Sequence, residues 1–361
     1  MKQELTNRER IIATLHKKEV DRLCWSPLID SYFINSLYLQ NINMDIIEAM
    51  RYIGNDIMER HVASPLPVSK NVSVEEKWSA DGKVKRINYI TPVGTIYEEK
   101  KLSGETIYTS KHLIETLEDV QIYQYIAENT TFNDDIKAFV ERNQYIGDDG
   151  MATPEAPMTP IQSLLQDKAG VENTVFLMAD YPDEMDELLE AMHERNKREC
   201  EVLAKYPAEV VIGYEDTSST VMSRNMFQNY SAPQIDDYAD IFHNSGKVYI
   251  THMCGKLSAF AQDIGAGKQD GIDSVCPPTT GDFCAWDARS AWGPDKVIIG
   301  GIEPPALARM NVEQTLAYVD EIMQRMKGQR GFILSTGDAT SFGTPIENLI
   351  AITKHIKSFK W

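Results

Sequence analysis

The pattern of apolar and polar positions alternates between two periods, most regularly in the second half of the chain. Short apolar runs, typical of buried strands, are separated by segments in which apolar residues recur every three to four positions, as on one face of a helix. The predicted strands of this half are 210–216, 248–254, 271–276, 296–303 and 331–336, and the predicted helices are 223–230, 235–244, 257–265, 284–292, 312–326 and 346–358. Strands that alternate with helices predict a parallel sheet.

The N-terminal part adds further units of the same kind. Residues 6–16 read as a helix that Thr6 or Asn7 caps, 23–28 as a first strand, 44–53 as a helix and 56–60 as a short second strand. The whole chain then contains about eight strand–helix units, which favours a TIM (β/α)8 barrel over an open sheet. Barrels routinely reach this length as one unit, so residues 1–361 are predicted to form a single α/β domain.

Residues 72–109 differ from this pattern. Polar and apolar positions alternate there with a period of two, and the runs are broken by Asp81-Gly82 and by Pro92-Val93-Gly94. This is typical of antiparallel β-hairpins joined by tight turns. We expect an insertion that covers one end of the barrel, with no domain of its own.

Composition limits the classes of partner. The net charge is −18 and no run of lysine or arginine could follow a phosphate backbone, so nucleic acid and anionic membrane surfaces are excluded as partners. No apolar stretch approaches the roughly 20 residues needed to cross a bilayer, and the first residues lack the apolar centre of a signal peptide. The five scattered cysteines fit free thiols in a reducing cytoplasm. The oligomeric state is not predicted.

His252 and Cys254 are the most informative pair in the sequence. They close the predicted strand 248–254, where alternation places both side chains on one face. An imidazole and a thiol at the point where a strand enters a loop form half of a site for a soft divalent metal such as zinc. Gly255 directly after the pair leaves room above it.

In a TIM barrel the functional residues lie at the C-terminal ends of the strands. Other polar or metal-binding side chains fall at these predicted ends: Glu155, Tyr214, Glu215, Asp216, Cys276 and Asp338. Because the strand bodies are apolar, these residues and the pair at 252 and 254 are predicted to gather at one end of the barrel.

Six short patterns, in the right order along the chain, resemble the uroporphyrinogen decarboxylase superfamily. They are the opening segment 5–11 followed by Asp21-Arg22, the loop 150–160, the helix start 181–185, the turns 279–282 and 299–303, and the helix entry 343–348. The resemblance implies a TIM barrel, in agreement with the count of strand–helix units.

The resemblance is to the cobalamin-dependent methyltransferase branch of that superfamily. The decarboxylases carry an N-terminal segment whose arginines bind the carboxylates of the porphyrinogen. Here residues 25–33 read Trp-Ser-Pro-Leu-Ile-Asp-Ser-Tyr-Phe, and no arginine occurs between Leu23 and Met50. A substrate with many carboxylates is disfavoured by a chain of this net charge without those arginines.

The methyltransferase branch implies a zinc site made of a His-x-Cys pair and a distant cysteine. His252 and Cys254 match the pair, but Asp338 stands in the turn where the cysteine is expected. The resemblance therefore leaves open whether Asp338 is a ligand, whether Cys276 supplies the second thiolate, and whether Glu215 is a fourth ligand. Each is of a type that zinc accepts.

The function implied is a zinc-dependent methyltransferase that moves a methyl group between a small methylated substrate (an ether, amine or thiol) and a corrinoid (cobalamin). The chain lacks a corrinoid-binding segment, so a partner protein is expected to carry the corrinoid. A carboxylate ligand makes a harder, more acidic zinc than a second thiolate does, which favours demethylation of an ether or amine. Glu155, Tyr214 and Asp216 are candidates for positioning the substrate or moving a proton. The alternatives are a metal-free decarboxylase and a non-catalytic barrel with a structural metal.

Overall fold

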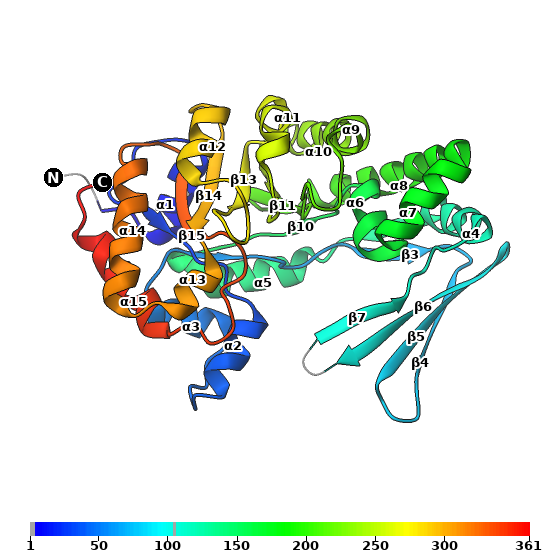
Figure 1. Ribbon diagram of the computed structural model, residues 1–361, viewed down its shortest axis with the longest axis horizontal. Helices are drawn as coiled ribbons and strands as arrows, with labels where there is room; N and C mark the ends of the chain where they lie inside the picture. Colours follow the sequence, from blue (N-terminus) through cyan, green and yellow to red (C-terminus); the bar gives the residue numbers. More distant parts are fainter. Residues whose placement is uncertain (1–3, 104–105) are drawn as a thin grey trace.

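The computed structural model describes residues 4–103 and 106–361 and contains the predicted parallel sheet (Figure 1). All neighbouring strands of its seven-stranded sheet are parallel, in the order β1-β15-β14-β13-β12-β11-β10. Their bounds are Cys24–Trp25 (β1), Glu155–Ala156 (β10), Val210–Tyr214 (β11), Val248–His252 (β12), Gly271–Val275 (β13), Val297–Ile302 (β14) and Phe332–Thr336 (β15). A second parallel pair joins β2 (Ile57–Glu59) to β9 (Gly150–Ala152).

A backbone hydrogen bond joins these two groups of strands on one side, and the chain itself joins them on the other. The Asp56 N–H donates to Trp25 O at 2.8 Å, which links the start of β2 to β1. On the other side, β9 continues through Thr153 and Pro154 into β10. The Thr153 N–H extends the β2–β9 ladder by donating to Glu59 O at 2.8 Å. The structure is therefore an α/β barrel of the predicted class, although the β1–β2 contact is much shorter than a regular ladder.

Helices lie outside the strands, as the period of the sequence predicts (Figure 1). Those predicted at 6–16, 312–326 and 346–358 correspond to α1 (Asn7–Leu15), α14 (Val312–Met326) and α15 (Ile346–Ser358). The other helices are α2 (Ser31–Tyr38), α3 (Ile46–Ile53), α4 (Leu117–Glu128), α5 (Ile136–Ile146), α6 (Pro160–Ser163), α7 (Gly170–Asp180), α8 (Pro182–Leu203), α9 (Arg224–Met226), α10 (Ala232–His243), α11 (Ala261–Ala266), α12 (Ala285–Trp292) and α13 (Pro304–Arg309). None of the helices in the described ranges is long and apolar enough to span a membrane.

Two helices contain a wider turn than the apolar period indicates. The segments Leu164–Lys168 (η2) and Phe227–Ser231 (η3) are π-helical and continue α6 and α9. Both follow a strand of the barrel closely in the chain. Such turns are rare and occur often at functional sites, since they change the direction in which side chains point.

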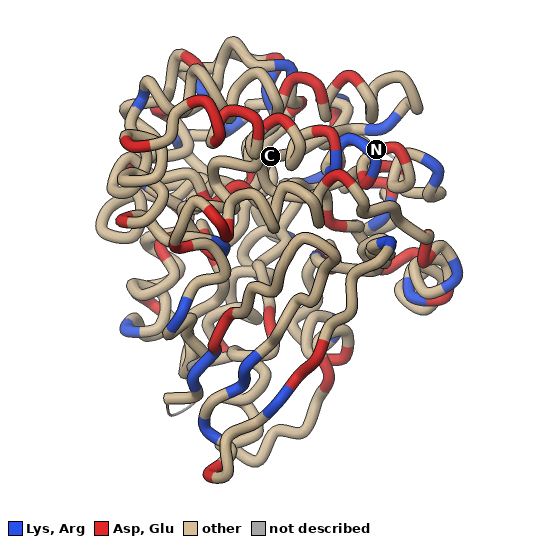
Figure 2. The backbone as a smooth tube through the Cα atoms, turned by 90° about the vertical axis from the view of Figure 1, so that its right-hand side faces the viewer, with Lys and Arg blue, Asp and Glu red and all other residues tan. Residues whose placement is uncertain are grey.

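The segment predicted at 72–109 forms an antiparallel sheet that projects from the barrel (Figure 1). Its strands are β4 (Ser73–Trp78), β5 (Val84–Thr91), β6 (Gly94–Ser103) and β7 (Thr106–Lys111), and the nearby β3 (Leu66–Ser69) and β8 (Thr130–Asn133) pair with each other. Figure 2 shows acidic and basic positions interspersed along the backbone, this sheet included, rather than a single basic stripe.

The interior of the barrel is filled by every second residue of the strands, as the period of two requires. The inward rows run Val210–Ile212–Tyr214 on β11 and Val248–Ile250 on β12, and Met58 and Ile299 face them from β2 and β14. Ile11 and Leu15 of α1 belong to the same buried cluster. Helix α1 therefore closes the N-terminal end of the barrel.

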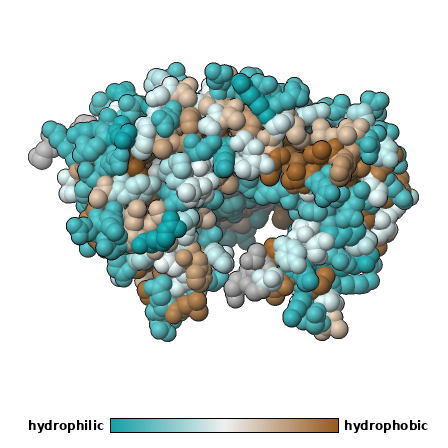
Figure 3. All heavy atoms as spheres, in the orientation of Figure 1, coloured by the Kyte–Doolittle hydropathy of each residue, from teal (hydrophilic) through white to brown (hydrophobic). Residues whose placement is uncertain are grey.

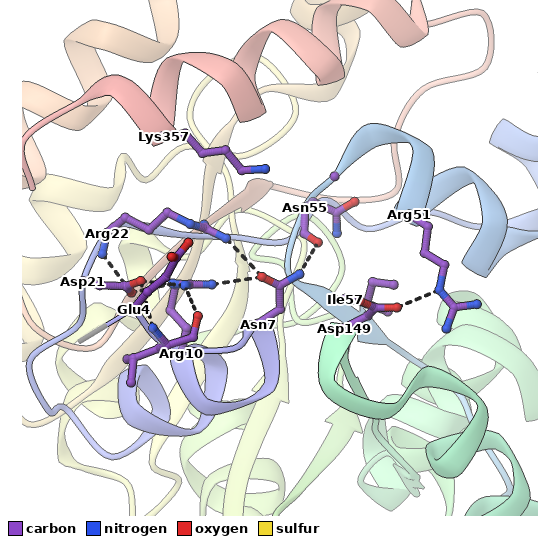
Figure 4. Close-up of a pocket in the computed structure, with 12 residues that line it drawn as sticks. Glu4, Asn7, Arg10, Asp21, Arg22, Arg51, Asn55, Ile57, Asp149 and Lys357 are labelled. Atoms are coloured by element: carbon purple, nitrogen blue, oxygen red, sulfur yellow. Dashed lines mark hydrogen bonds and ion pairs between the residues drawn. The ribbon is translucent and has the colours of Figure 1, made fainter. Parts of the chain in front are cut away.

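A largely buried group of charges holds α1 against the strands, and Figure 4 shows three of its members, Arg10, Asp21 and Arg22. The Arg10 guanidinium, only 2% exposed, donates to both Asp21 oxygens and to Asp56 Oδ1, each at 2.7 Å. Asp56 also accepts from Arg22 and from the Trp25 N–H at 2.9 Å. Burial alone would lower the pKa of Arg10, but the two carboxylates outweigh it and raise that pKa. This network connects α1 to the place where β1 and β2 meet.

We predict that Arg10→Ala lowers the free energy of unfolding by about 3–5 kcal/mol, because Asp56 would keep a buried charge with one partner fewer. Urea unfolding followed by circular dichroism measures this. Lys137→Ala is the matched control, since Lys137 makes only an exposed pair with Glu141, and its effect should stay within roughly 0.5 kcal/mol. A loss below about 1 kcal/mol for Arg10→Ala would show that the network does not hold the barrel closed.

Candidate metal centre

The inward rows of the strands end in polar residues at the C-terminal end of the barrel. Tyr214 of β11 pairs in register with His252 of β12, and His252 pairs with Asp273 of β13. Arg60 lies two residues beyond the inward-facing Met58 of β2 and reaches the same layer. The residues that continue the apolar rows therefore form a polar layer directly above the barrel core.

His252 is held by a buried ion pair. Its Nδ1 lies 2.9 Å from Asp273 Oδ2, and the Arg60 guanidinium donates to the two oxygens of Asp273 at 3.0 and 3.1 Å. Burial alone would raise the pKa of Asp273, but the charge of Arg60 and the hydrogen bond from His252 outweigh it and lower that pKa. Asp273 is thus an ionised carboxylate that accepts a hydrogen bond from His252 Nδ1–H. The lone pair of a neutral His252 is then on Nε2.

Three possible ligand atoms gather on the Nε2 side of His252. Its Nε2 lies 3.8 Å from Asp216 Oδ1, and the Cys254 thiol lies 3.5 Å from the same oxygen. The ligand atoms of Asp216, His252 and Cys254 all fall within 4.8 Å of one another. Nitrogen, sulfur and carboxylate donors at such spacing suit a divalent transition metal, zinc above all.

The electrostatics of this cluster favour a cation. Burial, then the charges of Asp216 and Asp338, raise the pKa of the Cys254 thiol far above its ordinary range. Burial alone would lower the pKa of His252, but its hydrogen bond to Asp273 and the charges of the nearby carboxylates raise it. Both groups thus hold their protons more tightly than in water, and a divalent cation would displace those protons and neutralise the carboxylates.

Asp216 is held in place from both sides. Gln166, in the π-helical turn η2, donates Nε2–H to Asp216 Oδ2 at 2.8 Å, which leaves Oδ1 toward Cys254 and His252. The backbone of Asp216 has a φ of +40°, in the left-handed region that residues other than glycine seldom adopt. His61, after β2, has a φ of +62°. Strained backbone at two strand ends is typical of a functional site.

Glu155 and Tyr214, predicted to position substrate or move a proton, lie beside the cluster together with His61. The ring of Tyr214 stacks on His61 at 3.8 Å between centroids and lies 4.9 Å from the ring of His252. His61 Nδ1 in turn contacts Glu155 Oε2 at 3.0 Å, and both side chains are exposed. Burial raises the pKa of Tyr214 well above its ordinary value, so the hydroxyl keeps its proton.

Asp338 and Cys276, two of the three candidates to complete the metal site, lie next to the cluster but outside it. Asp338 is near enough for its charge to raise the pKa of both His252 and Cys254, while its Oδ1 accepts from the Ala339 N–H at 2.7 Å. Burial raises the pKa of Cys276 to about 12, and its side chain packs against Gly337. A side chain at Gly337 would clash with the Cys276 sulfur.

The third candidate, Glu215, points away from the cluster. Its two oxygens accept from the Thr159 N–H and hydroxyl, each at 2.8 Å, and burial raises its pKa to about 7. The cause is strand geometry: Tyr214 faces the barrel interior, so the next side chain faces the surrounding helices. Glu215 thus connects β11 to the start of α6.

The sequence patterns did not single out Arg60, Asp273 or Gln166. The first two could have been found by extending each inward row by one step of two residues, from Met58 to Arg60 and from Gly271 to Asp273. Gln166 could not have been found in this way, because its direction depends on the π-helical turn.

We predict that the protein binds about one zinc ion per chain and that His252→Ala or Cys254→Ala abolishes this binding. Asp273→Asn should weaken it by about 10- to 100-fold, since Asp273 orients His252 without touching the ion. Titration with zinc, and with cobalt(II) to reveal a thiolate absorption band, measures both effects.

Cys284→Ala is the matched control for Cys254→Ala, because Cys284 is a half-buried free thiol at the start of α12, away from the cluster. It should bind zinc as the unaltered protein does. Unchanged binding and an unchanged cobalt band in Cys254→Ala would contradict the assignment.

Comparison with known proteins identifies the family. Residues 150–359 match the uroporphyrinogen decarboxylase (URO-D) family. A methyltransferase from Methanosarcina mazei has a similar structure, with a TM-score of 0.65 at 14% identity over 98% of this chain and 99% of that one. A Listeria monocytogenes protein, provisionally assigned as a vitamin-B12-independent methionine synthase, is more distant, with a TM-score of 0.41 at 11% identity over 93% and 96% of the two chains.

No curated protein sequence matches the chain. The matched region runs from β9 to the end of α15 and contains every residue of the Asp216–His252–Cys254 cluster. The structural likeness to the Methanosarcina protein extends over nearly the whole chain and indicates the same fold. The chain is a member of the uroporphyrinogen decarboxylase family.

Proposed function

We propose that the protein is a zinc-dependent methyltransferase, which moves a methyl group between a small methylated substrate and the corrinoid of a partner protein. The Asp216–His252–Cys254 cluster, oriented by Asp273, is the observation that carries this proposal. The resemblance of the sequence to the methyltransferase branch of the family supplies the reaction class.

The donor set fits zinc. Three ligand atoms of types that zinc accepts lie within 4.8 Å of one another, and the second nitrogen of the histidine is bound to a carboxylate, as is usual for zinc-binding histidines. Zinc bound there would act as a Lewis acid on the heteroatom that carries the methyl group, or would lower the pKa of a bound thiol. Asp216 is half-buried, so the cluster can be reached from outside.

We infer that Asp216, rather than Glu215 or Cys276, completes the ligand set. Its Oδ1 lies 3.8 Å from His252 Nε2 and 3.5 Å from the Cys254 sulfur. Asp338 lies outside this set, and its negative charge acts on both His252 and Cys254. A set with one thiolate and one carboxylate makes the metal harder than a set with two thiolates, which supports an ether or amine as the methylated substrate.

The residues beside the cluster would handle the substrate and its proton. When an ether or amine loses its methyl group, the heteroatom keeps the bonding electron pair and must take up a proton. The exposed pair of Glu155 and His61 lies at the open end of the barrel and can carry that proton. The buried Tyr214 hydroxyl makes no hydrogen bond in the described part of the chain and is available to a bound molecule.

The two alternatives are less well supported. A porphyrinogen decarboxylase must attract many carboxylates, but Glu155, Asp216 and Asp338 place negative charge at the open end of this barrel. A purely structural zinc site closes all its ligand positions with protein atoms. Here the described residues bring three such atoms together, and the partly exposed thiol and carboxylate leave a side accessible.

We expect the corrinoid protein to approach the open end of the barrel. Figure 3 shows the molecule hollowed between the inserted sheet and the part that carries α2 and α3. Residues of α2 directly follow the C-terminal end of β1, so this hollow lies on the side of the strand ends that carry the cluster. The five cysteines are free thiols, which fits the cytoplasm as the expected compartment.

We predict that His252→Ala and Cys254→Ala each slow methyl transfer from a methylated donor to cob(I)alamin by about 100-fold or more, because the Lewis acid would be lost. A screen of methyl ethers, amines and thiols with free cob(I)alamin, followed by its absorption spectrum, measures the rate. Removal of zinc by a chelator should have the same effect, and added zinc should restore the rate.

Cys284→Ala serves again as the control and should keep the full rate. Full methyl transfer by either cluster variant would exclude a role for the metal. Release of carbon dioxide from a porphyrinogen by metal-free protein would establish the decarboxylase instead.

A further inference from the structure

A second feature of the open end of the barrel is a cavity of about 570 Å³. Residues of β6 and β7, from the inserted sheet, form one wall. The loop after β10, the turn η2 and helix α8 form the other wall. The insertion and the barrel thus enclose the cavity together.

The cavity adjoins the candidate metal centre. Gln166 lines it and at the same time donates its hydrogen bond to Asp216 at 2.8 Å. Pro157 and Met158, which also line it, directly follow β10 at the C-terminal end of the strand. Gln166 therefore belongs to the cavity lining and contacts a residue of the cluster at the same time.

The π-helical turn η2 shapes this wall. It presents three consecutive residues, Gln166, Asp167 and Lys168, to the cavity, which a regular helical turn does not do. Helix α8 presents residues spaced three and four apart, on one face: Met192, Arg195, Asn196 and Glu199.

The charged groups of the cavity leave an excess of positive charge. Lys100, Lys168 and Arg195 line it against two carboxylates, Asp167 and Glu199. Lys168 Nζ contacts Asp167 Oδ2 at 2.7 Å. Lys100 lies 3.9 Å from the other oxygen of Asp167 and 3.6 Å from Glu98, which does not line the cavity. Burial, opposed by the charge of Arg195, raises the pKa of Glu199 to about 7. The charged side chains that line the cavity thus carry a net positive charge, whereas the whole protein has a net charge of −18.

The guanidinium of Arg195 uses only part of its hydrogen-bond donors within the described residues. Its Nη1 contacts Asn196 Oδ1 at 2.9 Å and Glu199 Oε2 at 3.3 Å. Its Nε and Nη2 make no hydrogen bond within residues 4–103 and 106–361. A guanidinium with two open donors is suited to a carboxylate, which it binds with paired hydrogen bonds.

Part of the remaining lining is apolar or aromatic, and Thr109, Ser163 and Asn196 add polar groups. The apolar and aromatic residues are Ile107 and Tyr108 of the inserted sheet, Tyr123 of α4, Pro157 and Met158 after β10, and Met192 of α8. A cavity of this size and lining accommodates a ring or a short hydrocarbon body.

We propose that this cavity binds the methyl donor, and that the donor is an organic carboxylate. Its anionic end would lie at Arg195 and Lys168, its apolar body against the tyrosines and methionines, and its methyl-bearing end toward Gln166 and the metal cluster. The proposal rests on the proposed methyltransferase function, since it names the substrate class of the same site.

The test measures binding to the zinc-loaded protein by calorimetry, with each carboxylate matched to its neutral amide. The probes are 3-methoxybenzoate and 3-methoxybenzamide, and methoxyacetate and methoxyacetamide. At least one carboxylate should bind about tenfold or more tightly than its amide, which is the contribution expected of a charge-assisted hydrogen bond. If no carboxylate binds better than its amide, the proposal is overturned.

Variants locate the anion. Arg195→Gln and Lys168→Gln should each weaken binding of the carboxylate about tenfold or more while the affinity for the amide changes less than about twofold. Arg195→Lys keeps the charge and should restore part of the affinity, which excludes misfolding as the cause. The control is Lys197→Gln, which removes a positive charge from the same helix, where Lys197 pairs with Glu194 outside the cavity. An equal loss for Lys197→Gln and Arg195→Gln would overturn the proposal.

Methyl transfer to cob(I)alamin is measured separately, so the two proposals can fail independently. Arg195-dependent binding of a carboxylate without any methyl transfer would remove the proposed function and leave an anion-binding cavity. Methyl transfer from neutral donors alone, insensitive to Arg195→Gln, would keep the function and overturn the substrate class.

Discussion

The buried pairing of Arg60, Asp273 and His252 is the interaction on which the candidate site depends. It joins β2, β13 and β12, which are distant in the sequence, through one carboxylate that is fully buried. Replacing one of the three residues leaves a buried charge without its partner, so a single substitution here is strongly destabilising. Because Asp273 takes the Nδ1 side of His252, the Nε2 side is left for the cluster. The buried ion pair of Arg60 and Asp273 thus determines which nitrogen of His252 faces the cluster.

Much of the fold could be predicted because it follows from local periodicity. The apolar runs at 248–254 and 296–303 are strands, and the three- to four-residue period at 312–326 is a helix with those same bounds. The boundaries near the site were less predictable: the strand at 248–254 ends at His252, so Cys254 lies in the loop beyond it. The barrel expectation holds, whereas the single hydrogen bond between β1 and β2 has no signature in the sequence.

For the candidate site, the sequence identified residue types but could not rank them. His252, Cys254 and Asp216 come together because the inward rows of two neighbouring strands end at the same height, which a pattern of spacing can indicate. Glu215, adjacent to Asp216, was an equally good metal ligand on composition alone, and only the direction of its side chain separates the two. The cavity under the inserted sheet depends on the π-helical turn, whose apolar spacing is that of an ordinary helix.

The position of α1 limits the routes by which a molecule can reach the candidate metal site. Its Ile11 and Leu15 fill the N-terminal end of the barrel, and Arg10 ties it there. The barrel is therefore closed at its N-terminal end and filled by side chains, so any molecule that reaches the cluster enters and leaves at the C-terminal end. A small donor and a large partner that use one opening compete for it. In the proposed reaction the donor would therefore have to bind before the partner protein, and its product would leave only after the partner has withdrawn.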